Sequence, residues 1–303
     1  MHNLVMDKIK VIILGASGFV GRNLMEVFRE NESIEAIPGS SSEKPGHLWL
    51  DILKPDTWEN LVHLQPDIVI DASGYGIVKY QQDLHLLYDI NYLKKRDFLD
   101  YVAQNHPNVF WVQVGTAFEY QLEQETLTEE TPCLPKTHYG ISKMMFSQYL
   151  LHKPGIRFTI LRPFGMFGEG EDNSKFFPLL INAQKDKQSI DLSDGSQGRD
   201  YMYVRDLASF VLHKITSRPL QEIENQVINL GSGTCHSLRD LAERFAKEIP
   251  DFNPELWNWG AIPQRSGEND KFYNASTKAV SLGFKNYNLQ EAIRNTVKFY
   301  YTN

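Results

Sequence analysis

Residues 10–21 read Lys-Val-Ile-Ile-Leu-Gly-Ala-Ser-Gly-Phe-Val-Gly, and the fold class can be inferred from this segment first. Its apolar first half predicts a buried β-strand over residues 10–15, and residues 19–30 have the apolar spacing of a helix. A G-x-x-G-x-x-G run lies between them. There, one glycine makes a tight turn, one lets backbone N–H groups approach a pyrophosphate, and one lets helix and strand pack closely. The stretch therefore predicts a strand–turn–helix unit that binds a dinucleotide.

The start of this helix is a second reason to expect a dinucleotide. The first N–H groups of a helix have no intrahelical partner, and the helix dipole places partial positive charge at the same end. Both features attract phosphate oxygens. We therefore predict that the following residues contact the cofactor: Gly15, Ser17, Gly18, Phe19, Val20, Gly21 and Arg22.

The first half of the chain alternates short apolar runs with longer helical patterns. Strands are predicted at 10–15, 33–38, 66–73, 108–115 and 157–164, and helices at 19–30, 57–64, 84–105 and 139–151. Such alternation is typical of a parallel sheet covered by helices on both faces. The predicted fold class is α/β, a Rossmann-type doubly wound parallel sheet.

Beyond Gly165 the elements become shorter, and Gly, Asp, Ser and aromatic residues become more frequent. This change predicts a smaller C-terminal substrate-binding region. Two later segments, 200–207 and 226–231, again have strand patterns and could rejoin the sheet. We expect residues 1–164 to form the NAD(P)-binding domain, with residues 200–231 returning to it, and residues 165–303 to be mainly substrate-binding.

The end of the second strand bears on which nicotinamide cofactor binds. An acidic residue at that tip would hold a free ribose 2′-hydroxyl. Glu35 has the right spacing, but the strand continues to Pro38, so we expect Glu35 to lie within it. The tip itself carries neutral hydroxyls from Ser40 onward, which could bond a 2′-phosphate, with Arg22 and Lys44 nearby to supply positive charge. NADP(H) is favoured, and NAD(H) stays possible.

Catalytic side chains are predicted at Tyr139, Lys143 and Thr116. Tyr139 and Lys143 lie four residues apart at the start of a helix, and thus on one face. A nearby ammonium lowers the pKa of a tyrosine, which otherwise is a poor acid–base catalyst at neutral pH. Thr116 follows a predicted strand at the edge where ligands bind in such sheets, and its hydroxyl could hold the reacting oxygen.

Composition excludes several other classes of function. The net charge of −7 and the lack of a Lys/Arg block argue against a nucleic-acid partner. The apolar run within residues 1–15 is only about five residues long, too short for a signal sequence or a membrane span. The histidines and cysteines have no metal-ligand spacing, so no metal is predicted. We expect a cytoplasmic protein without a membrane partner.

The sequence resembles the extended short-chain dehydrogenase/reductases, which include nucleotide-sugar epimerases, dehydratases and 4-keto reductases. The resemblance covers nearly the whole chain. The matching residues are Gly15, Gly18 and Gly21, Asp71-Ala72-Ser73-Gly74, Asn91, Thr116 with Tyr120, Tyr139 with Lys143, Leu161-Arg162-Pro163-Phe164, Gly198-Arg199-Asp200-Tyr201, Val204-Arg205-Asp206-Leu207, Asn229-Leu230-Gly231-Ser232-Gly233, Arg265-Ser266-Gly267-Glu268 and Leu282-Gly283-Phe284.

This resemblance implies a nucleotide-sugar substrate. Arg199 and Arg265 match positions that contact the nucleotide diphosphate, a role that suits the guanidinium fork, and Thr116 would contact the sugar. Further cofactor contacts are expected at Ser40, Asp51, Ile52, Ala72, Ser73, Gly74, Asn91, Tyr139, Lys143 and Pro163. The resemblance also implies a homodimer formed by the helix after Asn91 and the helix of Tyr139, with contacts expected from Tyr92, Phe98, Leu99, Met144, Met145 and Tyr149.

The chain departs from the family where dehydratases carry an Asp-Glu pair after the catalytic hydroxyl. Here Ala117 and Phe118 follow Thr116, so dehydration is not expected. The favoured hypothesis is reduction of a 4-keto deoxysugar, with Tyr139 as the acid. A 4-epimerase with tightly bound NAD is the close alternative. A non-catalytic, dinucleotide-binding regulatory protein is the alternative from a different class.

Overall fold

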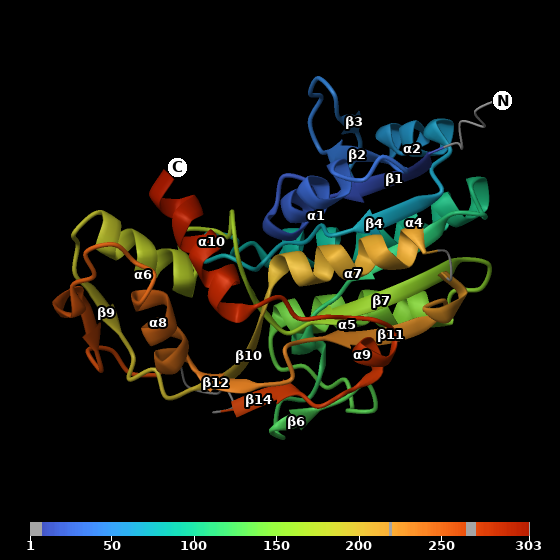
Figure 1. Cartoon of the computed structure of the whole chain (residues 1–303). Helices are drawn as coiled ribbons and strands as arrows, with labels where there is room; N and C mark the ends of the chain where they lie inside the picture. Colours follow the sequence, from blue (N-terminus) through green and yellow to red (C-terminus); the bar gives the residue numbers. More distant parts are fainter. Residues whose placement is uncertain (1–7, 218–219, 265–270, 303) are drawn as a thin grey trace.

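The computed structural model describes residues 8–217, 220–264 and 271–302. Its centre is a seven-stranded sheet in the order β11-β7-β5-β4-β1-β2-β3, in which every pairing is parallel (Figure 1). The strands are β1 (Ile9–Leu14), β2 (Ile34–Ser40), β3 (Leu48–Trp49), β4 (Ile68–Asp71), β5 (Phe110–Val114), β7 (Arg157–Pro163) and β11 (Gln226–Leu230). The predicted α/β class with a parallel, doubly wound sheet is confirmed.

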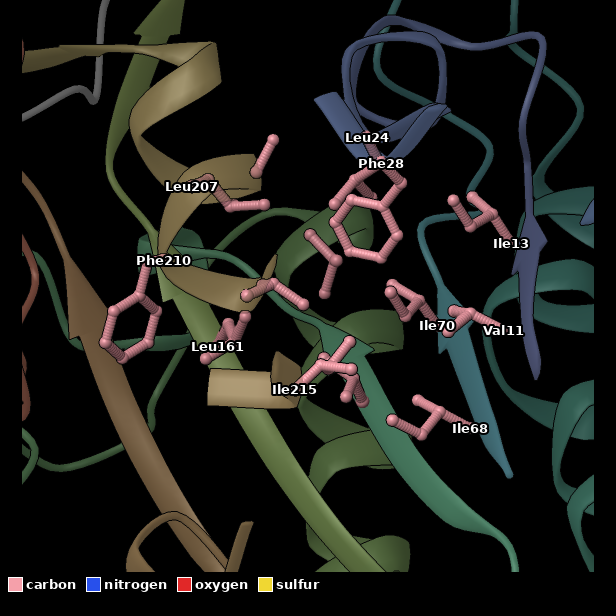
Figure 2. Close-up of a cluster of buried hydrophobic side chains, with 14 of the residues drawn as sticks. Val11, Ile13, Leu24, Phe28, Ile68, Ile70, Leu161, Leu207, Phe210 and Ile215 are labelled. Atoms are coloured by element: carbon pink, nitrogen blue, oxygen red, sulfur yellow. The ribbon is translucent and has the colours of Figure 1, made fainter. Parts of the chain in front are cut away.

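Helices cover both faces of this sheet. On one face, α1 (Phe19–Arg29) and α7 (Val204–Thr216) pack against each other and onto the strands, and Figure 2 shows Leu24, Phe28 and Leu207 converging above them. Burying each such side chain contributes roughly 1.5–3 kcal/mol. The other face is covered by α2 (Glu59–Leu64), α4 (Lys94–Asn105) and α5 (His138–His152).

The helix predicted over residues 84–105 is interrupted. It consists of α3 (Leu84–Tyr88), one π-helical segment over Asp89–Leu93, and α4. A π-helical turn inserts an extra residue and rotates the following helix, a local feature that apolar spacing does not reveal. This segment contains Asn91, which is completely buried.

A second sheet is formed mostly by strands from the C-terminal half of the chain, in the order β12 (Cys235–Ser237), β10 (Gly198–Tyr203), β14 (Lys271–Asn274) and β6 (Thr126–Leu127). β8 (Gly165–Phe167) also pairs with β10. The strand predicted over 200–207 was therefore wrong in two respects: only residues 200–203 are strand, and they belong to this second sheet instead of the large one. From Val204 onward the apolar residues recur at helical spacing, and this part is α7.

The remaining elements form a lobe at one end of the molecule, around β10 (Figure 1). It contains α6 (Phe176–Lys185), α8 (Leu238–Ala246), α10 (Leu289–Thr302), β9 (Ile190–Leu192) and β13 (Trp257–Trp259). Its core is aromatic: the rings of Phe177 and Phe245 stack with centroids 4.5 Å apart. The short α9 (Lys278–Ser281) lies next to β11 instead. Among the residues described, no helix is long and apolar enough to cross a membrane.

Candidate active site

The predicted site residues meet at the carboxyl ends of neighbouring strands. Gly15 follows β1, Ala72 follows β4, Thr116 follows β5, and Pro163 ends β7. Because β1, β4, β5 and β7 are adjacent in the sheet, these four positions share one edge. Ligands of open α/β sheets bind in the crevice at this edge.

The glycines of the first turn are required by close backbone contacts. Gly15 has a φ of +71°, and a Cβ there would lie 2.9 Å from the backbone of Ala72 and Ser73. A Cβ on Gly21 would lie 2.2 Å from the carbonyl oxygen of Gly15. The N–H of Gly18 donates to the same carbonyl at 2.9 Å. A side chain at Gly15 or Gly21 would therefore force the turn open.

The beginning of α1 fits a pyrophosphate. Gly18 is its N-cap without a side-chain cap bond, and its first turn carries no acidic residue, so neither feature competes with an anion. Arg22 reaches back over the turn to the carbonyl of Ser17 at 3.4 Å and lies against Gly170. The dinucleotide expected from sequence therefore fits this end of the sheet.

Glu35 is the second residue of β2, where it is the register partner of Lys10, and Ser40 ends the strand. The expectation that Glu35 lies within the strand is confirmed. Of the other residues predicted nearby, Asp51 accepts a hydrogen bond from the N–H of Leu53 at 3.0 Å. Ile52 is buried.

The loop after β4 is held by Asn91. The side-chain oxygen of Asn91 accepts from the N–H of Tyr75, and its amide nitrogen donates to the carbonyl of Tyr75, both at 2.9 Å. The same nitrogen donates to Ser142 on α5 at 3.0 Å. Both polar atoms of the Asn91 side chain are thus hydrogen-bonded within the protein, and they hold the loop that carries Ala72, Ser73 and Gly74.

Tyr139 and Lys143 occupy the first turns of α5, whose N-cap Thr137 accepts from the N–H of Gly140 at 3.1 Å. The buried Nζ of Lys143 donates to the carbonyl of Val114 at 2.7 Å. Burial, followed by the charge of Lys95, lowers the pKa of Lys143 to about 8. Lys143 is therefore mostly protonated and positively charged at neutral pH, and it loses this proton as the pH rises through about 8.

Thr116 is fixed by a capping box, in which its hydroxyl accepts from the N–H of Phe118 and its own N–H donates to Glu119 at 3.0 Å. Burial, followed by the carboxylate of Glu119, raises the pKa of Tyr139, while the side chain of Thr116 acts to lower it. Without cofactor, Tyr139 is therefore held as the phenol, the form that can give a proton.

Glu119 is fully buried and forms an ion pair with Arg162 on β7, whose Nε and Nη2 both lie 2.9 Å from Oε2. The guanidinium also lies over the ring of Tyr120, 4.6 Å from its centroid. Glu119 was not among the site residues predicted from the sequence. A charged residue three positions after a predicted catalytic hydroxyl, where a capping box needs one, was the available signal.

Two more buried charges were given no role from the sequence: Asp71 was named only as a match to the family pattern, and Lys95 was not singled out. Asp71, the last residue of β4, pairs with Lys95 of α4 at 2.7 Å, and both side chains are almost completely buried. The signal was an aspartate ending an otherwise apolar strand, together with a lysine four residues after Asn91 on the same helix face.

Arg199, predicted to contact the diphosphate of a substrate, lies on β10. Its guanidinium stacks over Phe272 at 4.7 Å from the ring centroid, and Nη1 donates to the carbonyl of Gly198 at 2.8 Å. Phe272 in turn contacts the half-exposed ring of Phe118, with centroids 5.9 Å apart. Arg199 thus lies on the Thr116 side of the sheet edge. Arg265, the other predicted diphosphate ligand, lies outside the described residues.

Comparison with known proteins places this geometry in a family. CDP-abequose synthase from Salmonella typhimurium is 24% identical over 303 residues, covering 95% of this chain and 97% of that protein. GDP-6-deoxy-D-talose 4-dehydrogenase from Aggregatibacter actinomycetemcomitans is 25% identical over 280 residues, covering 88% and 90%.

The fold is shared with solved structures. UDP-glucuronic acid 4-epimerase from Bacillus cereus, solved with UDP-glucuronic acid and NAD, superimposes with a TM-score of 0.84 at 19% identity, covering 97% of this chain and 99% of that one. The model of the NAD dependent epimerase/dehydratase family matches residues 11–231. These matches confirm the resemblance seen in the sequence, and the chain belongs to the NAD dependent epimerase/dehydratase family.

Proposed function

We propose that the protein reduces the 4-keto group of a nucleotide-linked deoxysugar, using a nicotinamide dinucleotide. The observation that carries the proposal is the convergence of Thr116, Tyr139 and Lys143 at the sheet edge beside the glycine turn. The two relatives described above support the proposal. One is named as a synthase of a CDP-linked sugar, and the other as a 4-dehydrogenase of a GDP-linked 6-deoxysugar.

The chemistry follows from the three side chains. When bound, the reduced nicotinamide supplies the hydride that adds to the carbonyl carbon. Tyr139 gives its phenolic proton to the carbonyl oxygen, which completes the alcohol, and the hydroxyl of Thr116 orients that oxygen. Lys143 stabilises the resulting phenolate until a proton from solvent restores it. Arg199 would hold the diphosphate of the substrate.

We further propose that two parts of the chain bind the two ligands. Residues 1–164, together with α7 and β11, would bind the dinucleotide, since α7 packs on α1 and β11 extends the same sheet. Residues 165–303 would otherwise bind the nucleotide sugar.

An assay separates the hypotheses. A nucleotide-linked 4-keto-6-deoxyhexose and NADPH should be consumed in equal amounts, giving the 4-hydroxy sugar. Mass spectrometry of the purified protein should show no retained NAD. An epimerase would retain NAD and interconvert 4-hydroxy sugars without net oxidation. Binding of dinucleotide without turnover of any tested nucleotide sugar would leave only the regulatory alternative, and the reductase proposal would then be wrong.

The cofactor is proposed to be NADP(H). Glu35 lies at the start of β2, and the tip near Ser40 carries hydroxyls instead of a carboxylate. Titration should give NADPH a Kd at least ten-fold lower than that of NADH, about 1.4 kcal/mol. Equal affinities, or tighter binding of NADH, would contradict the assignment.

We also propose a homodimer in the cytoplasm, formed through α5 and the helix after Asn91. Phe98 and Leu99, expected at the contact, are completely buried in the core of the same protomer and cannot supply it. Tyr92, Met144, Met145 and Tyr149 are only half-buried and stay candidates. Sedimentation at micromolar concentration should give twice the mass of the chain, and a monomer alone would refute this assembly.

A further inference from the structure

A second buried lysine lies beside the proposed catalytic pair. Nζ of Lys95 is 2.7 Å from Oδ2 of Asp71, and neither residue is exposed to solvent. A buried ion pair often stabilises a fold no better than apolar side chains of the same volume, because both charges lose their hydration. Stability alone therefore does not account for this pair.

The pair holds the loop after β4. Nζ of Lys95 donates to the carbonyl of Ser73 at 3.1 Å, while Oδ1 of Asp71 accepts from the N–H of Ser73 at 2.9 Å and from its hydroxyl at 2.5 Å. Every backbone and side-chain polar group of Ser73 is thus bonded to one of the two charged residues. The pair fixes the first part of the loop against the sheet.

The loop residue next to Ser73 faces the catalytic lysine. A Cβ built on Gly74 would lie 4.0 Å from Nζ of Lys143 and 3.6 Å from the side-chain oxygen of Asn91. Asn91 holds Tyr75 through two hydrogen bonds. The loop is therefore fixed on both sides of Gly74, at the point where it covers Lys143.

The pair also contributes charge to the surroundings of Lys143. Three charged groups face Lys143 from other elements: Asp71 of β4, Lys95 of α4 and Glu119 after β5. Lys95 lowers the pKa of Lys143, and the two carboxylates raise it. Burial would raise the pKa of Asp71, but the charges of Lys95 and then Lys143 outweigh it and lower that pKa.

We propose that Lys95, paired with Asp71, is a positioning residue of the active site, which fixes the loop over Lys143 and balances the charge around its ammonium. The proposal rests on the proposed reduction, in which Lys143 must carry its proton. Among the contacts of the described residues, none joins Lys95 to Tyr139, so Lys95 would act through the loop and through its charge.

The test is the pH dependence of kcat/KM for reduction. Lys143 is charged below its pKa, so in the wild type kcat/KM should fall as the pH rises through about 8. Lys95→Met removes a neighbouring positive charge, which should move this fall upward by roughly one pH unit. Lys95→Arg changes the packing but keeps the charge, so its profile should stay at the wild-type pH.

A second measurement needs no activity. The side-chain NMR signals of 13C-labelled lysines in cofactor-free protein report the titration of Lys143, identified as the signal missing in Lys143→Met. Lys95→Met should raise the pKa of Lys143 seen in this titration by the same amount, roughly one pH unit. The double variant Asp71→Asn with Lys95→Met leaves no unpaired buried charge, and it should show a smaller shift in the same direction.

Lys214→Met is the matched control. Lys214 of α7 is also buried and forms an ion pair with Glu222 at 2.8 Å, so its loss should leave the titration of Lys143 in place. If neither Lys95→Met nor the double variant moves the Lys143 titration, the proposed charge role is wrong. If the titration moves but the wild type turns over no nucleotide sugar, the effect of the Lys95 charge on Lys143 stands and the proposed reduction fails.

Discussion

Tyr139→Phe is expected to lower turnover by roughly 10²–10⁴, the usual effect of removing a positioned general acid. The substitution keeps the ring and its packing but removes the only proton that the side chain can give. Cofactor affinity should barely change, because the phenol is not proposed to hold the dinucleotide. Steady-state kinetics and a dinucleotide titration of the same preparation measure both effects.

Two other variants make this result specific. Tyr149→Phe removes a hydroxyl from the same helix, where it donates to Asp100 at 2.5 Å away from the catalytic residues, and its turnover should stay near the wild-type rate. Lys143→Met should weaken both turnover and cofactor binding, since the ammonium is proposed to serve both. A Tyr139→Phe protein that retains most of its activity would refute the catalytic assignment.

The second large effect concerns stability. Arg162→Leu should destabilise the fold by about 3–5 kcal/mol, because it leaves the carboxylate of Glu119 buried without its partner. The ion pair is nearly inaccessible, with side chains 3% and 0% exposed, so water cannot replace the guanidinium. Thermal unfolding should show a loss of roughly 5–8 °C in melting temperature.

Arg157→Leu is the control for this change. Arg157 lies on the same strand and pairs with Glu224 at 3.0 Å, but both side chains are partly exposed, and such pairs contribute at most about 1 kcal/mol. Adding Glu119→Leu to Arg162→Leu should recover much of the lost stability, although Thr116 would lose its capping carboxylate. Equal losses for Arg157→Leu and Arg162→Leu would contradict the argument from burial.

The sequence predicted most of the large sheet because its strands are continuous apolar runs separated by helical patterns. Gly15, Gly18 and Gly21 marked the turn, and the spacing of Tyr139 and Lys143 placed both on one helix face. These features depend on residues close together in the chain. They can therefore be recognised without knowing the tertiary structure.

The features that were missed depend on residues far apart in the chain. Asp71 and Lys95 are 24 positions apart, and Glu119 and Arg162 are 43 apart. No local pattern predicts that such charges meet inside the protein. The end of β10 was missed for a different reason, because Val204 continues an apolar pattern without any turn residue between strand and helix.

That direct junction has a mechanical consequence. β10, which carries Arg199, the proposed diphosphate ligand, ends at Tyr203, and α7 begins at the next residue on the face of the large sheet. Arg205, one residue further, pairs with Glu26 of α1 at 2.8 Å. Because no linker residue separates β10 from α7, we expect this junction to be rigid and not to act as a hinge. We therefore expect a displacement of β10 to move α7 with it, and through the Arg205–Glu26 ion pair to move α1, whose N-terminus is the proposed phosphate-binding end.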